Sequence, residues 1–228
     1  MFCQVAEERG LKVRVFRLDH GENLPDLIEG DLLLILGGPM GIRDINNPNY
    51  PWLLKEVDFI KSALKQKIGI IGVCLGAQLL AYAAGGDIQI LKGGSPPKPL
   101  PEIGWFPIFS NGKNKNDNLI SFLSLPLTVL HWHGDRILLP TTAELIASST
   151  RCEEQLFKIG PLAYGLQFHI ETDEGMVNRW IEEDNEFITA TLGLDGQSIL
   201  KEQQQEYEHK TLQSRLQLLH KLFDHLGF

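Results

Sequence analysis

Basic residues and cysteines are both scarce in this chain. Of its 228 residues, 21 are Lys or Arg and 29 are Asp or Glu, which gives a formal net charge of −8 at pH 7. Nucleic-acid binding needs a basic footprint, so this charge balance argues against it. The three cysteines form an odd and sparse set, which argues against a disulfide framework and for a reducing compartment. We therefore expect a cytoplasmic protein that binds no nucleic acid.

Long uncharged stretches are also rare. Residues 68–86 are a run of nineteen residues without a charge, long enough for hydropathy to suggest a membrane span. The run contains several glycines, Cys74 and Gln78, and its pattern changes from strand-like to helix-like. These features fit a buried α/β core better than a membrane helix, so no membrane association is expected.

The order of apolar patterns predicts an α/β fold with an open, mostly parallel sheet and helices on both faces. A later portion of the chain, with short strands in close succession, should be more antiparallel. The expected strands are 12–18, 31–36, 68–73, 127–132, 144–148, 155–159 and 162–169, and the expected helices are 2–9, 52–66, 173–188 and 197–223. A Pro/Gly-rich surface loop is expected at 92–101 and a polar connector at 111–118.

The most informative segment is G-V-C-L-G-A-Q at residues 72–78, which joins an apolar strand to a helix-like stretch. A cysteine between two glycines at such a junction is the thiol counterpart of the G-x-S-x-G turn. Gly72 and Gly76 allow a sharp bend and close packing. Cys74 would then sit at a helix N-terminus, which favours the thiolate. Cys74 is therefore the candidate nucleophile rather than a small core residue.

A nucleophilic cysteine needs a base, and the base needs a group that orients it. The segment G-L-Q-F-H-I-E at 165–171 alternates like a strand, and side chains two apart on a strand share a face. His169 and Glu171 should therefore project together. His169 would accept the thiol proton, and Glu171 would fix its tautomer.

A third segment, residues 32–41, is a buried-strand pattern that ends in the loop G-G-P-M-G. Such a loop can turn a backbone N–H toward a developing oxyanion, with the N–H of Leu75 as the second donor. A phosphate site is a weaker interpretation, because no Lys-Ser/Thr follows the glycines.

Four segments in this order and spacing resemble the class I, triad-type glutamine amidotransferases. They are G-G-P-M-G (37–41), G-V-C-L-G-A-Q (72–78), H-W-H-G-D (131–135) and G-L-Q-F-H-I-E (165–171). E-I-G-W at 102–105 resembles the free-standing members that are similar to the glutaminase domain of GMP synthase. The resemblance covers residues 1–190 and implies a flavodoxin-like amidotransferase domain, followed by a helical extension at 191–228.

The resemblance also implies roles for individual residues. Cys74, His169 and Glu171 would be catalytic, and Gly38 and Leu75 would donate to the oxyanion. The substrate would be held by Gln78, His133, Gly134 and Asp135. No cofactor is implied. His131 and His133 have chelate-like spacing, but without a third ligand in the sequence no metal is expected.

The chain departs from the family pattern at two places. Ile170 stands between the catalytic His and Glu, where the family usually has Pro. A β-branched residue suits a strand, so the shared face should survive. Met1 falls directly before the helical pattern of residues 2–9, whereas family members open with a strand. We therefore expect that the first strand is missing from this chain and that the native start lies upstream.

Three functions fit these observations. The first is a glutaminase that forms a Cys74 thioester and releases ammonia for a partner synthase, since the chain has no ATP-binding motif such as S-G-G-x-D-S. The second is a stand-alone γ-glutamyl hydrolase or peptidase. The third is a non-catalytic binding module, against which the intact Cys–His–Glu set argues. The small-molecule partner would be glutamine or a γ-glutamyl compound.

An apolar stripe in the C-terminal segment indicates a buried helix face. Leu212, Leu216, Leu219 and Phe223 recur at helical spacing. The stripe predicts packing against the chain's own core, or alternatively an interface for a homodimer or a synthase.

Overall fold

A seven-stranded sheet forms the centre of the computed structural model, which describes residues 1–111 and 125–228. The strand order is β1-β2-β11-β10-β9-β6-β7. One half contains the parallel strands β1 (Leu32–Ile35), β2 (Gly69–Val73) and β11 (Ala163–Leu166). The other half contains β10 (Leu156–Ile159), β9 (Ala143–Ser148), β6 (Glu102–Ser110) and β7 (Leu127–His133), all in antiparallel pairing.

The α/β class is confirmed, and the division of the sheet into a parallel and an antiparallel half indicates where a functional site is expected. Two of the six neighbouring strand pairs are parallel and four are antiparallel, so the antiparallel portion expected for the second half is the larger one. The parallel strands β1, β2 and β11 end at one edge of the sheet. Loops after such carboxyl ends are where open α/β sheets build their sites.

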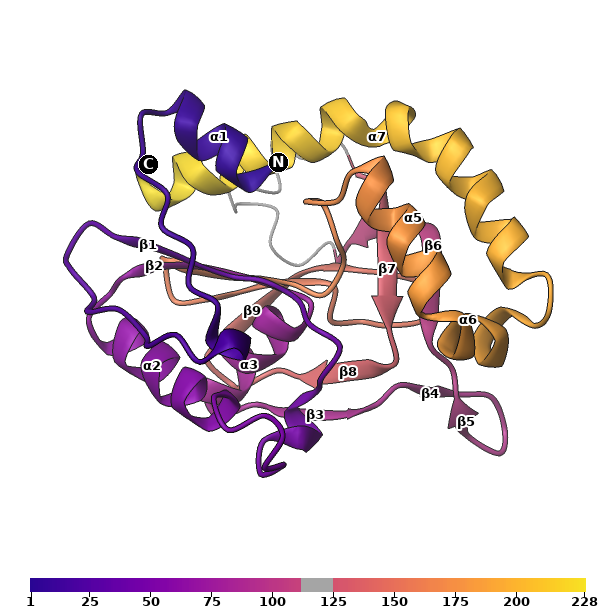
Figure 1. Cartoon of the computed structure of the whole chain (residues 1–228), viewed down its shortest axis with the longest axis horizontal. Coiled ribbons are helices and arrows are strands. Elements are labelled where there is room, and N and C mark those ends of the chain that lie inside the picture. Colours follow the sequence, from indigo (N-terminus) through magenta and orange to yellow (C-terminus); the bar gives the residue numbers. More distant parts are fainter. Residues whose placement is uncertain (112–124) are drawn as a thin grey trace.

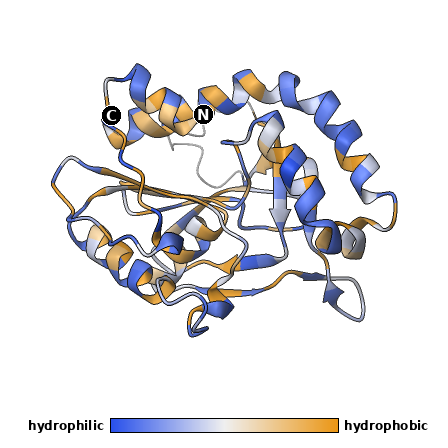
Figure 2. Cartoon of the chain, viewed as in Figure 1, coloured by the Kyte–Doolittle hydropathy of each residue, from blue (hydrophilic) through white to orange (hydrophobic). Residues whose placement is uncertain are grey.

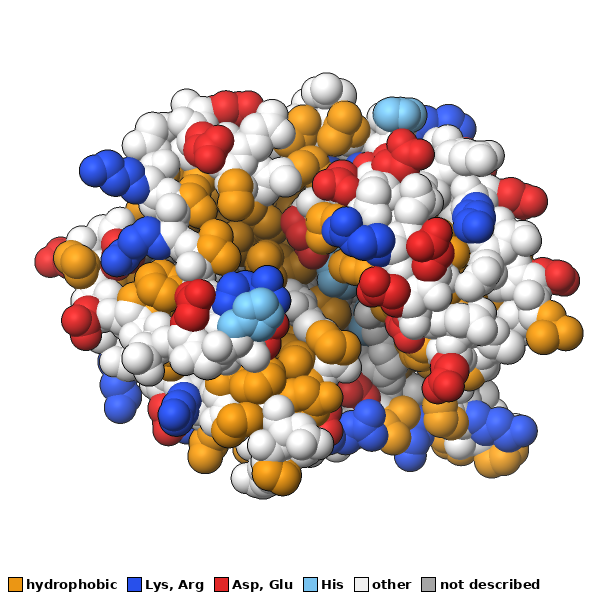
Figure 3. Space-filling model, viewed as in Figure 1, with side chains coloured by type: hydrophobic (Ala, Val, Ile, Leu, Met, Phe, Trp, Pro, Cys, Tyr) orange, Lys and Arg blue, Asp and Glu red, His pale blue; other side chains and the backbone are white. Residues whose placement is uncertain are grey.

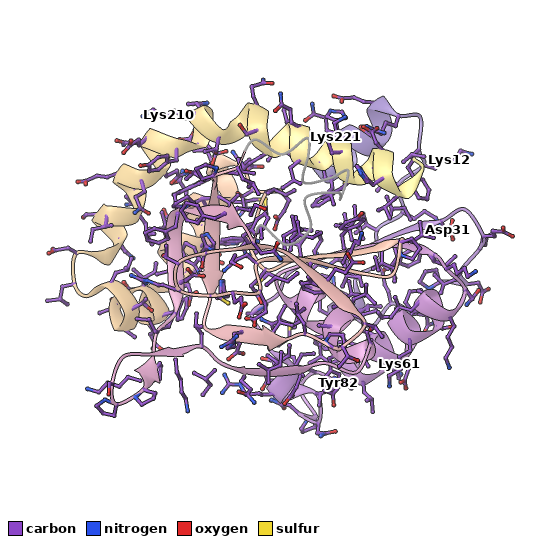
Figure 4. All side chains as sticks on the ribbon, turned by 180° about the vertical axis from the view of Figure 1, so that it is seen from behind. Lys12, Asp31, Lys61, Tyr82, Lys210 and Lys221 are labelled. Carbon is purple, nitrogen blue, oxygen red and sulfur yellow. The ribbon has the colours of Figure 1, made fainter. Side chains whose placement is uncertain are left out.

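Helices cover both faces of the sheet, as Figure 1 shows. The helices α2 (Leu53–Lys65) and α3 (Leu75–Ala83) lie on one side, and α1 (Phe2–Glu8) and α7 (Gly196–Leu226) lie on the other. Seen from behind, Lys61 of α2 and Tyr82 of α3 mark the first layer, and Lys210 and Lys221 of α7 mark the second (Figure 4). The remaining elements are η1 (Leu18–His20), η2 (Ile42–Asp44), β3 (Asp87–Ile90), β4 (Lys92–Gly93), β5 (Lys98–Pro99), β8 (Asp135–Leu138), α5 (Glu174–Glu183) and α6 (Asn185–Leu192).

Helix α2 shows how the spacing of apolar residues determines which helix face is buried. On α2, the side chains of Leu53, Val57 and Ile60 recur at helical spacing and are fully buried. They belong to the same apolar cluster as the inner face of α3. The helix expected at 52–66 is therefore confirmed, to within a residue at each end.

The C-terminal helix packs on the chain's own core. Leu218, Leu219, Leu222 and Phe223 are buried in the cluster that also contains β2 and β7 side chains. In Figure 2 the end of α7 near the C-terminus carries more hydrophobic residues than its hydrophilic middle. Own-core packing, the first of the two alternatives for this stripe, is what the structure shows. The boundary near residue 190 stays a prediction, although α7 shares a core with the sheet.

Strand β1 is the edge of the sheet, and it exposes apolar surface. Within the described residues no strand pairs with its outer side. Leu36, directly after the strand, is 51% exposed, and Val15 in the N-terminal segment is 71% exposed. Figure 3 shows hydrophobic side chains gathered on the viewed face between α7 and these strands.

The strand expected at 12–18 is wrong. Residues 11–17 have no regular structure, and Leu18–His20 form the 3₁₀ helix η1. The alternating apolar residues Val13, Val15 and their neighbours have a strand pattern, but they form no ladder with any described strand, although the outer side of β1 is unpaired. An alternating apolar pattern alone therefore does not make a strand, because strand formation depends on its context in the sheet.

Other expectations differ in detail. The loop expected at 92–101 contains the short hairpin of β4 and β5. The strand expected at 162–169 ends at Leu166. The helix expected at 173–188 is two helices, α5 and α6, that meet at Asp184. The polar connector expected at 111–118 lies outside the described residues except for Asn111.

The uncharged stretch 68–86 is a core strand followed by a core helix. β2 is buried at all five positions, and α3 begins directly after Cys74. Among the described residues, no helix is both long and apolar enough to cross a membrane.

Candidate active site

Cys74 lies on a sharp turn between β2 and α3, as expected. Its φ is +52° and ψ is −108°, a conformation that side chains other than glycine rarely adopt. A Cβ on Gly72 would lie 2.5 Å from the carbonyl oxygen of Gly76, and a Cβ on Gly76 would clash with the carbonyl of Ile35. Both glycines are therefore required for the close approach of strand, turn and neighbouring strand. Strain held at one residue by tight surroundings is typical of functional sites.

The sheet register brings the second half of the chain to Cys74. β2 pairs in parallel with β11, with Val73 opposite Leu166. The backbone N–H of Cys74 donates to the carbonyl of Leu166 at 2.7 Å. The segment after β11 therefore leaves the sheet at the same edge as the nucleophile turn. This parallel pairing is the reason that His169, distant in sequence, reaches the thiol.

His169 and Glu171 are paired directly. Nδ1 of His169 lies 2.7 Å from Oε1 of Glu171, and the two side chains are 4% and 10% exposed. They lie beyond the end of β11, in an extended segment where the N–H of His169 donates to the carbonyl of Leu130 at 2.8 Å. The N–H of Ile170 donates to Oε2 of Glu171 at 2.9 Å. A proline at position 170 could not make this bond, because it has no N–H.

The charges of this pair are strongly coupled. Burial opposes the charged ring, but the Glu171 carboxylate and the Cys74 sulfur outweigh it and raise the pKa of His169 to about 10. Burial likewise opposes the ionised carboxyl, yet His169 and the backbone hydrogen bonds lower the pKa of Glu171. At neutral pH this arrangement favours an imidazolium held by a carboxylate.

The glycine-rich loop lies against these groups. A Cβ on Gly37 would lie 3.4 Å from Cβ of Cys74 and 3.4 Å from Cε1 of His169. A Cβ on Gly38 would lie 3.3 Å from the side chain of Leu75, the first residue of α3. The loop and the helix N-terminus, which were expected to supply the two oxyanion donors, are therefore neighbours at the thiol.

Gln78 forms part of a buried chain of amides that ends at the thiol. Its Nε2 donates to Oε1 of Gln167 at 3.3 Å, and Nε2 of Gln167 donates to the sulfur of Cys74 at 3.7 Å. Gln78 is therefore one residue removed from the sulfur in this structure. Sequence analysis missed Gln167, although its position two residues before His169 in an alternating segment was the available signal.

Two tryptophans flank the base, and sequence analysis missed both. The ring of Trp180 from α5 lies edge-on to His169 with centroids 4.8 Å apart, and it contacts Trp132 of β7 at 5.5 Å. Nε1 of Trp132 donates to Asp184 at 2.7 Å, and its carbonyl oxygen lies 3.9 Å from the Cys74 sulfur. Such a wall limits the motion of the imidazole and its access to water. The positions of the two tryptophans in the sequence do not predict their contact with His169.

The segment 133–135 is divided between two environments. His133 is buried, and its Nε2 faces the carboxylate of Glu102 rather than the thiol. Asp135 lies within 3.3 Å of Arg43, and a Cβ on Gly41 would lie 3.5 Å from its Oδ2. Burial raises the pKa of Asp135, and Arg43 opposes this effect. Asp135 therefore faces the glycine-rich loop, whereas His133 does not.

The family assignment follows from this turn, triad and sheet together. The sequence model described as glutamine amidotransferase class-I matches residues 1–185, and the chain belongs to that family. The resemblance found in the sequence motifs is thereby confirmed. The match includes the nucleophile turn, the glycine-rich loop and the segment with His169 and Glu171.

Several known proteins are similar to this chain in sequence. A glutamine amidotransferase-like protein, YfeJ, of Salmonella typhimurium is 34% identical over 80% of this chain and 76% of its own length. A GMP synthase of Cytophaga hutchinsonii is 26% identical over 77% of this chain, but the match spans 32% of that protein. Gamma-glutamyl peptidase 3 of Arabidopsis thaliana is 27% identical over 75% of this chain and 67% of its own length.

A solved structure supports the same assignment. The crystal structure of a glutamine amidotransferase from Thermotoga maritima matches 100% of this chain and 92% of its own, with a TM-score of 0.78 and 31% identity. The fold of the whole chain, α7 included, is therefore similar to that of an amidotransferase.

Proposed function

We propose that this protein is a glutaminase of the amidotransferase type, which cleaves the side-chain amide of glutamine through a thioester on Cys74. The observation that carries the proposal is the direct pairing of His169 with Glu171 at 2.7 Å, beside a cysteine held at positive φ. A structural cysteine would need neither the strained turn nor an oriented imidazole. Membership of a family whose members act on carbon–nitrogen amide bonds supports the same chemistry.

In the first half of the reaction the Cys74 thiolate attacks the amide carbon of the substrate. The new C–S bond forms as the carbonyl electron pair moves onto oxygen, where N–H groups of the 37–41 loop and of Leu75 would receive the charge. Each such donor is worth about 3–4 kcal/mol of transition-state stabilisation. The C–N bond then breaks, and His169 gives its proton to the leaving nitrogen, which departs as ammonia.

In the second half water replaces ammonia. His169, now neutral, accepts a proton from water as the oxygen attacks the thioester carbon. The C–S bond breaks, glutamate leaves, and the thiolate and imidazolium are restored. Glu171 stays ionised throughout and holds the Nδ1 proton, which keeps Nε2 directed toward the reacting atoms.

The polar ends of the substrate also need fixed partners. We propose Asp135 for the α-ammonium group, because a partly buried carboxylate forms a strong charge-assisted hydrogen bond with a cation. Asp135 lies beside the glycine-rich loop at Gly41. Binding would exchange the contact with Arg43 for one with the substrate.

A stand-alone γ-glutamyl peptidase is the second candidate, because a relative with that name matches 75% of this chain. The thioester chemistry is identical and only the leaving amine differs. Initial rates of ammonia release from glutamine and of amine release from γ-glutamyl dipeptides separate the two. Faster turnover of glutamine supports the glutaminase, and faster turnover of the dipeptides supports the peptidase.

Covalent labelling tests the shared step without choosing between substrates. A diazo-ketone analogue of glutamine should add one label to Cys74, detected by intact mass and peptide mapping. The exposed Cys3 provides the matched control. Cys3→Ala should label as the wild type does, and Cys74→Ala should not label. An unlabelled wild type, inactive toward both substrates, would leave only the binding-module interpretation.

A partner synthase belongs to the glutaminase proposal. The chain contains no S-G-G-x-D-S motif, so ammonia transfer to an acceptor would need another protein. Glutamine hydrolysis by this chain should then be independent of ATP, and a cognate synthase should increase its rate.

A further inference from the structure

Three ligand-type side chains meet on the strand pair behind the active site. Glu102 opens β6, and His131 and His133 lie near the end of β7. In the antiparallel register Glu102 stands opposite His133, and Gly104 stands opposite His131. The two histidines alternate with Trp132, so they share the face of β7 that Trp132 does not occupy. The proposed glutaminase reaction uses none of the three.

The cluster is deeply buried and closely spaced. Glu102 is 1% exposed, His131 0% and His133 3%. Oε2 of Glu102 lies 3.2 Å from Nε2 of His133 and 3.6 Å from Nδ1 of His131. All three ligand atoms lie within 4.8 Å of one another. Donors on a tetrahedral zinc ion at bonds of about 2.0–2.1 Å lie roughly 3.4 Å apart, so two of the three separations already fit.

The orientation of His131 leaves a lone pair directed at the carboxylate. Its Nε2 lies 3.3 Å from the carbonyl oxygen of Phe106, which can only accept, so the proton belongs on Nε2. Nδ1 is then the unprotonated nitrogen, and it is a buried atom without a hydrogen-bond partner. A lone pair 3.6 Å from a carboxylate oxygen is unfavourable unless a cation lies between them.

His133 repeats this pattern. Its Nδ1 lies 2.9 Å from the carbonyl oxygen of Asp135 and must donate there. In the neutral ring Nε2 is then the lone-pair nitrogen, and it faces Oε2 of Glu102. Metal-binding histidines usually donate their second ring N–H to a carbonyl or carboxylate in this way. Both histidines therefore have the outer hydrogen bond of a ligand and a second ring nitrogen directed at Glu102, and that of His131 has no hydrogen-bond partner.

The geometry points to a metal site formed by Glu102, His131 and His133, which would hold one divalent transition ion of the zinc class. Two imidazoles and a carboxylate suit Zn²⁺, Co²⁺ or Fe²⁺ better than Mg²⁺ or Ca²⁺, which prefer oxygen ligands. The carboxylate has its own supports, as ligating carboxylates commonly do. Ser149 donates to Oε1 at 2.5 Å and Gln155 donates to Oε2 at 2.6 Å.

Gln155 adds a fourth polar group. Its Nε2 also lies 3.3 Å from Nε2 of His133, and its Oε1 is buried without a hydrogen-bond partner. The two ends of an amide are assigned from their hydrogen bonds, and a bound cation would favour the reversed orientation of Gln155, in which its hydrogen bond to Oε2 of Glu102 is given up. Its oxygen would then become the fourth donor that a structural zinc site requires.

The ion would act on the site through the backbone. Trp132 lies between the two histidine ligands, and its carbonyl oxygen is 3.9 Å from the Cys74 sulfur. Bonds from the ion to both neighbours would fix the strand that borders the thiol. The ion would therefore have a structural role, and His133 would bind the metal rather than the substrate.

Cobalt binding tests the site with a direct spectroscopic readout. The full chain is stripped with a chelator and unfolded in denaturant, then refolded with Co²⁺, because the ligands are buried in the native state. We expect one Co²⁺ per chain, with the intense visible absorption of four-coordinate cobalt, and loss of that absorption when Zn²⁺ is added. X-ray absorption of the zinc form should show two imidazole nitrogens among its ligands.

Four variants locate the ion. His131→Phe and Glu102→Gln should each weaken Co²⁺ binding by more than the 10- to 100-fold typical of lost outer-sphere partners. The exposed His209 gives a matched control, and His209→Phe should bind as the wild type does. Cys74→Ala should also bind normally, which separates this site from the thiol and from the fate of the proposed function.

Two results would overturn the inference. The first is a wild type that takes up no Co²⁺ during refolding while it regains its native circular dichroism. Nitrogen-15 shifts showing both ring nitrogens of His133 protonated would then identify the cluster as an imidazolium–carboxylate pair. The second is Co²⁺ binding that His131→Phe leaves unchanged. If Glu102→Gln fails to fold, the wild-type cobalt spectrum and Co²⁺ binding by His131→Phe still test the inference.

Discussion

At the scale of single residues, Cys74 combines reactivity with backbone strain. A non-glycine residue at φ +52° costs about 1–3 kcal/mol, and the surrounding close contacts hold it there. The strain directs the sulfur out of the turn toward His169, the loop at Gly37 and the amide of Gln167. The turn thus lowers stability locally, but it holds the Cys74 sulfur in position.

Substitutions at Cys74 separate these two effects. Cys74→Ala should lower glutamine hydrolysis by a factor of about 10⁶, as loss of a nucleophile does elsewhere, and should leave the fold intact. Cys74→Gly should be equally inactive but more stable than the alanine variant by about 1 kcal/mol, because glycine accepts positive φ. Urea unfolding measures the stability difference, and ammonia release measures the loss of activity. Substantial activity in either variant would contradict the assignment.

Glu171 should set the alkaline limit of activity. Its carboxylate raises the pKa of His169, so Glu171→Gln should lower that pKa, and the imidazolium should be lost at lower pH. The alkaline limb of kcat/KM should therefore move to lower pH, with kcat reduced by up to about 10⁴-fold.

The exposed Glu182 provides the control for this change. Glu182→Gln should leave the pH profile of kcat/KM where it is in the wild type. An alkaline limb that does not move in Glu171→Gln would show that the carboxylate does not govern His169.

Ile170 should affect the acid limit instead. Its N–H donates to Glu171 and helps to lower the pKa of that carboxyl. Ile170→Pro removes the donor, so the pKa of Glu171 should rise and the acid limb of kcat/KM should move to higher pH. Ile170→Val keeps the N–H and should cost only about 0.5–1.5 kcal/mol of stability, with no shift in the profile. Identical profiles for the two variants would contradict this role.

At the scale of secondary-structure elements, α7 completes the core rather than extending from it. Its buried leucines pack in one cluster with side chains of β2 and β7, and fully buried Arg215 pairs with Glu208 at 2.7 Å. With α1, this helix covers the face of the sheet opposite α2 and α3 (Figure 1). The family match at 1–185 ends before this helix, yet its side chains belong to the main core cluster.

Leucine-to-alanine changes measure that dependence. Leu219 is fully buried, so Leu219→Ala should lower the free energy of unfolding by about 2–5 kcal/mol. Leu194 is 94% exposed, and Leu194→Ala should change it by less than about 0.5 kcal/mol. Urea denaturation followed by circular dichroism compares them. Equal stability of the two variants would mean that α7 does not contribute to the core.

At the scale of the whole molecule, α7 buries much of the apolar stripe that was the alternative candidate for a homodimer interface. Leu219 and Phe223 of the stripe are buried in the core cluster, and Leu216 packs against it. We therefore predict a monomer in the absence of a partner protein. Light scattering after gel filtration should give a mass near 25.6 kDa. A dimer of twice that mass that persists on dilution would contradict the prediction.

Several features could be predicted from sequence because their causes are local. The nucleophile turn depends on Gly72 and Gly76 beside Cys74, the helix α2 on a repeat of apolar residues, and the pairing of His169 with Glu171 on a spacing of two. The expected absence of a first strand stays a prediction. The strand expected at 12–18 shows the limit of such patterns, because strand formation depends on its context in the sheet.

Tertiary structure decided what depends on strand pairing. The parallel register of β2 and β11 brings His169 to Cys74, and the antiparallel register of β6 and β7 brings Glu102 to His133. The chelate-like spacing of His131 and His133 was visible in the sequence, but its third member was not. Neither Glu102 nor Trp180 carries a local signal of its role, because each meets its partner only after distant segments have packed together.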